Sequence, residues 1–109
     1  MSTLAKQLDP YIHRYVRKGG KQNRKQQMTR LLIFINWQQQ HEQITGLEQL
    51  GKRHVILFWK HHRHQQDATA YHYWLAIRIL WEWLNKATPP PKPLHMTELN
   101  HLKNDPKPP

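Results

Sequence analysis

The stretch from Ala68 to Lys86 constrains the fold most, because apolar residues follow helical spacing around nearly its whole circumference. Its apolar members are Tyr71, Trp74, Leu75, Ile77, Ile79, Leu80, Trp81, Trp83 and Leu84. Such a helix lies in the middle of a domain and is contacted on several sides. A membrane span is disfavoured, since His72, Arg78 and Glu82 would each be costly in lipid. We therefore predict a core helix, with Asp67 as its N-cap.

A first helix is predicted over residues 10–18. Asp9 is a favourable N-cap residue and Pro10 suits the first helical position. The two glycines at positions 19 and 20 are expected to stop this helix.

A second helix is predicted over residues 24–40, with Asn23 as N-cap and Gln26 completing a capping-box pattern. The polar residues from Gln38 to Gly46 are expected to form a loop. A third helix is predicted over about 51–63, with a buried face of Val55, Ile56, Phe58 and Trp59.

A length of 109 residues suits one domain. The expected fold is an all-α bundle of four to five helices, built of two helical hairpins and followed by a Pro-rich C-terminal tail. Residues 1–88 form the domain, and 89–109 form a linker and tail. Residues 94–103 could form the short fifth helix.

The chain is strongly basic, with a formal net charge of +10. Between Tyr11 and His41 there are seven Lys and Arg residues and no acid. This imbalance predicts attraction to polyanions, with nucleic acid first and an anionic membrane second. Solvated basic faces usually carry interspersed acids, so a run without any favours a surface that faces phosphate.

Several chemistries are disfavoured. Without cysteine there is no disulfide, thiol nucleophile or thiolate zinc site. The histidines at positions 61, 62 and 64 lack a third oriented ligand, so we expect no metal site. Paired carboxylates, a phosphate-binding glycine loop and a catalytic triad are all missing. We expect a cytoplasmic protein that is not an enzyme, with no cofactor and no small-molecule substrate.

The layout resembles the core-binding domain of tyrosine recombinases, the SAM-like N-terminal domain of phage integrases. Three segments carry the resemblance: NRKQQMTRLLIFINW at 23–37, ATAYHYWLAIRILWEWL at 68–84 and LHMTEL at 94–99. Asn23 and Gln26 replace the family's usual Ser and Thr. The last segment is similar to the opening of the family's catalytic domain, which is missing here. No His is followed by Arg three positions later, so the resemblance implies DNA binding without cleavage.

The resemblance implies a clamp on double-stranded DNA at a recombination site, on which further recombinase protomers assemble. The first turns of the second and fourth helices would face the DNA. The candidate contacts are Lys21, Asn23, Arg24, Lys25, Gln27, Arg30, Thr69, His72 and Tyr73. Asn23 fits a simple helix cap equally well, and His72 and Tyr73 fit partial burial.

Five tryptophans in a basic chain raise the possibility of base stacking on single strands. Each lies at helical spacing within an apolar run, so core packing is expected for most of them, with Trp74 the most exposed. The aromatic-rich stretch after Asp67 also suits an alternative role, a stand-alone protein-interaction or regulatory module.

Overall fold

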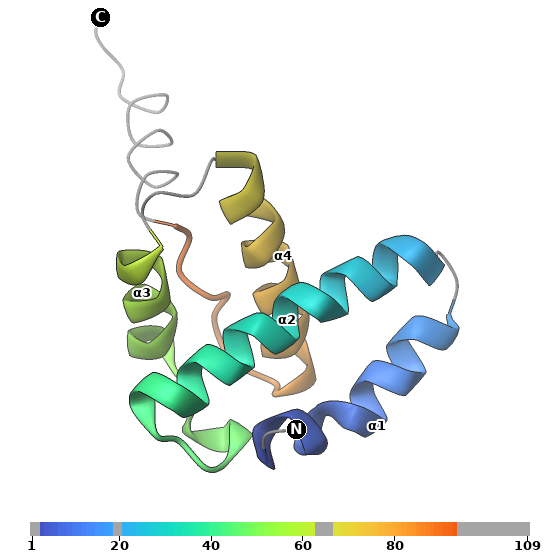
Figure 1. The fold of residues 1–109 in the computed structure, drawn as a ribbon, viewed down its shortest axis with the longest axis horizontal. Helices are drawn as coiled ribbons and strands as arrows, with labels where there is room; N and C mark the ends of the chain where they lie inside the picture. The colour runs from blue at the N-terminus through green and yellow to red at the C-terminus, as the bar shows by residue number, and fades with distance from the viewer. Residues whose placement is uncertain (1–2, 19–20, 63–66, 94–109) are drawn as a thin grey trace, which may run out of the picture.

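The computed structural model describes residues 3–18, 21–62 and 67–93 (Figure 1). Its elements are α1 (Thr3–Arg17), α2 (Lys21–Glu42), the 3-10 turn η1 (Leu47–Gln49), α3 (Lys52–His61) and α4 (Asp67–Trp83). The described ranges contain no strand, which confirms the all-α bundle. The expected break at residues 19–20 and the expected helix at 94–103 lie outside the described residues.

The longest helix, α2, packs against all three other α-helices. Figure 1 shows α2 crossing in front of α4, while α1 runs back against α2 and α3 lies to the other side of α4. Phe34 of α2 and Phe58 of α3 meet edge to face in the core, with ring centroids 5.1 Å apart. As expected, α4 is contacted on several sides, since Trp83 stacks on Tyr11 and Tyr73 contacts Phe58.

The first helix begins earlier than predicted, and Pro10 lies inside it instead of starting it. Leu4 and Leu8 are fully buried, so the extra turns bury apolar surface that a start at residue 10 would leave exposed. The Gln7 side chain also fixes this segment, donating to the Thr45 carbonyl and accepting from the Leu47 amide. These contacts offset the cost of an interior proline, about 3 kcal/mol.

The second helix extends past both predicted ends. It begins at Lys21, so Asn23 lies in its first turn and the assignment of Asn23 as N-cap is wrong. It continues to Glu42, and Gln38 is a fully buried core residue instead of the first loop residue. The Gln38 amide donates to the His54 carbonyl at 2.8 Å, which ties α2 to α3. Gln43 ends the helix with a φ of 54°.

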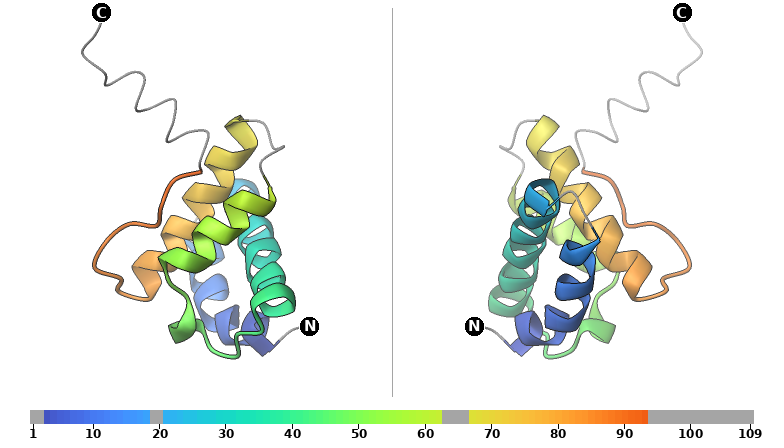
Figure 2. Two further views of the ribbon diagram at one scale, coloured as in Figure 1. Left: turned by 90° about the vertical axis from the view of Figure 1, so that its left-hand side faces the viewer. Right: turned by 90° about the vertical axis from the view of Figure 1, so that its right-hand side faces the viewer.

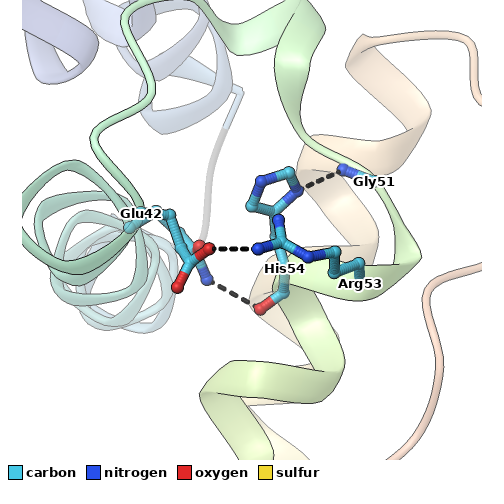
Figure 3. A network of polar contacts seen from close by, with 5 residues as sticks. Glu42, Gly51, Arg53 and His54 are labelled. Atoms are coloured by element: carbon cyan, nitrogen blue, oxygen red, sulfur yellow. Dashed lines mark hydrogen bonds and ion pairs between the residues drawn. The ribbon is translucent and has the colours of Figure 1, made fainter.

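The third helix is capped by its own histidine. Gly51, in an extended conformation, is the N-cap residue of α3. The Gly51 amide donates to Nδ1 of His54 at 3.0 Å (Figure 3), and the Gly51 carbonyl accepts from the His54 amide. Beside this cap, Arg53 forms an ion pair with Glu42 at 3.0 Å.

The fourth helix ends at Trp83, three residues before the predicted end, because the chain reverses there. Asn85 adopts a φ of 55°, and the Lys86 amide donates to the Trp81 carbonyl. The Asn85 amide donates to the Glu82 carbonyl. This pair of bonds is a Schellman motif with Asn in the position that glycine usually takes.

The proline segment 89–93 is not helical, as expected, but it packs on the bundle. Pro90 and Pro93 are buried. The indole N–H of Trp74 donates to the Pro90 carbonyl at 3.0 Å, and that of Trp59 donates to the Pro91 carbonyl at 2.9 Å. The packed structure therefore extends beyond residue 88, the domain boundary predicted from the sequence.

The expected exposure of Trp74 is wrong, because this segment covers its indole and leaves it 8% exposed. Trp59 and Trp81 are also buried, whereas Trp37 and Trp83 are half-buried. None of the helices in the described residues is both long and apolar enough to cross a membrane.

Candidate nucleic-acid interface

The outward face of α2 forms a continuous exposed stripe. Its members recur every three or four residues and so lie on one side of the helix. They are Gln22, Lys25, Gln26, Thr29, Ile33, Asn36 and Gln40. The stripe holds one cation and no acid, and most of its side chains are neutral hydrogen-bonding groups. Figure 2 shows α2 along the outer edge of the bundle, opposite the 89–93 segment.

The candidate contacts on α2 separate into accessible and buried groups. Asn23 and Lys25 are exposed. Gln27 is only 8% exposed, and its Oε1 accepts a 2.8 Å hydrogen bond from Arg30. Gln27 is therefore an internal partner of Arg30 and is not placed to contact a DNA base. The Lys21 side chain lies outside what the structure describes.

The Arg24 side chain of α2 packs against Tyr15 of α1. Its guanidinium lies 4.4 Å from the Tyr15 ring centroid, and its Nη1 donates to the Tyr15 carbonyl at 3.2 Å. These contacts hold α1 and α2 together, and because they occupy the half-buried guanidinium, the capacity of Arg24 to bind phosphate is reduced.

The last turns of α1 carry exposed cations that are not among the DNA contacts proposed from the sequence. Arg14, Arg17 and Lys18 are exposed there, with His13 just before them. This basic run was identified from the sequence, but the contacts proposed within it were limited to residues 21–30. The exposure of His13 and Arg17 follows from the helical phase set by buried Leu4 and Leu8, whereas Lys18 lies in the turn just after α1 ends.

The first turns of α4 expose Thr69 and His72, while Tyr73 is half-buried with its ring 5.7 Å from that of Phe58. In Figure 1 the first turn of α4 lies well apart from the first turn of α2. Asn23 and Lys25 are both exposed on α2, but residues two positions apart on a helix point in different directions, and only Lys25 belongs to the stripe. Thr69 and His72 lie on a separate part of the surface.

Two histidines, from the ends of α2 and α3, pack on the Trp37 ring. His41 of α2 stacks on it with ring centroids 4.7 Å apart, and His61 of α3 meets it at a tilt with centroids 5.2 Å apart. Nδ1 of His62 lies 2.7 Å from the Phe58 carbonyl. Within the described ranges, no group of three or more His, Cys, Asp or Glu residues is arranged to hold a metal ion.

No protein-family model, curated protein or solved structure matches this chain. Its functional assignment therefore rests on the chemistry of its surfaces.

Proposed function

We propose that this protein binds double-stranded DNA, with the outward face of α2 in the major groove and the basic end of α1 on the phosphate backbone. The observation that carries the proposal is the acid-free stripe on α2, rich in amide side chains and lying beside a helix end with three exposed cations. An α-helix fits the major groove of B-form DNA.

The chemistry of the stripe suits base edges. Gln and Asn can bond to adenine through two hydrogen bonds, and the methyl groups of Thr29 and Ile33 can contact the thymine methyl. Arg17 and Lys18 would supply affinity by displacing counterions from phosphate. The stripe is about 27 Å long at 1.5 Å per residue, roughly three quarters of one turn of duplex DNA.

The resemblance to tyrosine recombinases narrows the proposal to a core-binding module of a site-specific recombinase. In that arrangement Thr69 and His72 contact the duplex from a second side, and further recombinase protomers occupy the same DNA. The alternative of a protein-interaction module draws on the aromatic content of α4. Its support is weaker, because Trp74 and Trp81 are used in the core.

The test is duplex binding measured against salt concentration. We expect the logarithm of affinity to fall linearly with the logarithm of salt, and Arg17→Gln to reduce the slope by about one. Lys60→Gln, which removes an exposed cation on α3, is the matched control and should leave the slope nearly unchanged. Gln26→Ala should relax the preference among duplex sequences. Duplex affinity that is weak at low salt and insensitive to added salt would overturn the proposal.

A further inference from the structure

A hollow of about 290 Å³ lies between α1 and the last turn of α4. It is lined by Tyr11, Arg14, Tyr15, Lys18 and Trp83. Three aromatic rings and two cations thus surround one space, with no acid among the lining residues. This hollow is separate from the exposed stripe on α2.

The rings are held in place by one another and by the fold. Trp83 stacks on Tyr11 with centroids 5.3 Å apart and an interplanar angle of 16°. Tyr15 meets Trp83 edge to face at 6.0 Å. Arg24 holds Tyr15 from the α2 side through its stacking contact and its hydrogen bond. All three rings remain half-buried, so part of each is accessible.

The two cations stand beside the rings and face solvent. The Arg14 guanidinium lies 5.3 Å from the Tyr11 centroid, and both Arg14 and Lys18 are exposed. Neither Arg14 nor Lys18 forms an ion pair with a carboxylate of the described residues, whereas Arg53 on α3 pairs with Glu42. The hollow therefore combines an aromatic surface with uncompensated positive charge.

From this combination we infer that the hollow binds an unpaired nucleotide of single-stranded nucleic acid. The base packs against the exposed parts of Tyr11, Tyr15 and Trp83, and a flanking phosphate binds Arg14 and Lys18. Aromatic rings beside a positively charged groove are how proteins hold single strands without reading sequence. The volume lies near the lower end of the range for small-ligand sites, about 300 Å³, which suits a single nucleotide.

A base inside a duplex is covered on both faces by its stacked neighbours and would have to be unstacked to enter. The site therefore selects an unpaired nucleotide, such as one in a single-stranded tail. It does not require the α2 stripe to bind duplex DNA, so the two proposals can fail independently. A free mononucleotide shares the same chemistry, and the experiment separates it from a strand.

The experiment titrates the full chain with the hexanucleotide (dT)6, with thymidine monophosphate and with a blunt-ended DNA hairpin, following tryptophan fluorescence. We expect (dT)6 to quench the fluorescence and to bind at least about tenfold more tightly than the mononucleotide, because a strand offers several phosphates. Trp83→Phe should remove most of the quench. Trp37→Phe changes the other half-buried tryptophan and is the matched control.

Charge is tested in the same way. Arg14→Gln should weaken (dT)6 binding by about fivefold or more, and Lys60→Gln, which removes an exposed cation on α3 that does not line the hollow, by clearly less. Circular dichroism melts check whether each variant is folded. If a variant is unfolded, Tyr11→Phe or Lys18→Gln is used in its place.

Three outcomes would overturn the inference. In the first, (dT)6 does not bind while the hairpin does, which leaves the proposed function intact. In the second, (dT)6 binds but Trp83→Phe and Arg14→Gln behave as their controls do, which places binding elsewhere. In the third, the mononucleotide binds as tightly as (dT)6, which makes the site one for free nucleotides.

Discussion

At the scale of single residues, the fold controls the ionisation of His54. Burial is the main reason why its pKa is lowered from the usual value, and the positive charge of Arg53 acts in the same direction. Glu42 opposes this shift, and Lys86 adds to it. Because Nδ1 of His54 accepts the Gly51 amide, the bond that caps α3 requires this nitrogen to be unprotonated (Figure 3).

The lowered pKa predicts that the protein loses stability in mild acid. The unfolded chain takes up a proton on His54 near pH 6.5, and the folded chain does so only at lower pH. The contribution of His54 to the free energy of unfolding is therefore complete above about pH 6.5 and is lost as the pH falls through its folded-state pKa. Urea unfolding at a series of pH values between 7.5 and 5 measures this loss of stability. His54→Gln should flatten this pH dependence, whereas His13→Gln, on the exposed side of α1, should not. Equal pH dependence in His54→Gln and the unmodified protein would contradict this.

At the scale of elements, the segment 89–93 acts as a part of the core although it has no regular structure. It covers Trp74 and Trp59 and accepts a hydrogen bond from each indole. Just before it, Nζ of Lys86 donates to the Leu50 carbonyl at 2.6 Å. The return of the chain after α4 thus closes the face that α3 and α4 would otherwise expose.

Removing this segment is expected to destabilise the bundle. A chain ending at residue 88 should unfold with a free energy about 2–4 kcal/mol lower than one ending at residue 93, because two indole N–H groups lose their partners and two prolines their burial. Denaturant unfolding of the two chains gives this difference. Trp59→Phe should cost about 1 kcal/mol in the longer chain and clearly less in the shorter one. Equal stabilities for the two chains would show that the segment contributes nothing.

At the scale of the whole molecule, the net charge of +10 opposes folding through self-repulsion. Salt screens exposed charges over about 10 Å at 0.1 M, so it should relieve this repulsion. We expect the melting temperature to rise by about 2–5 °C between 20 and 200 mM NaCl. Calorimetry measures the rise, and replacing Lys52 and Lys60, both exposed on α3, by Glu should reduce it. An unchanged or lower melting temperature in salt would contradict the expectation.

The sequence by itself determined the helical class of this protein and the approximate place of each helix. Apolar spacing in residues 28–35 and 71–84 specifies helices directly, because periodicity is a local property of the chain. The absence of acids from 11–41 likewise predicted a basic surface before any fold was known.

Only the tertiary structure decided which side chains are available for contact. Gln38 and Gln27 lie at helical spacing from the buried Leu31 and Phe34, but their polar side chains gave no reason to expect burial. Nothing in the local sequence predicted that Arg24 would be held on Tyr15. Trp74 is buried and Trp83 is half-open because the chain returns over one and not the other. Exposure depends on which distant segment covers a residue, and no local pattern along the chain contains that information.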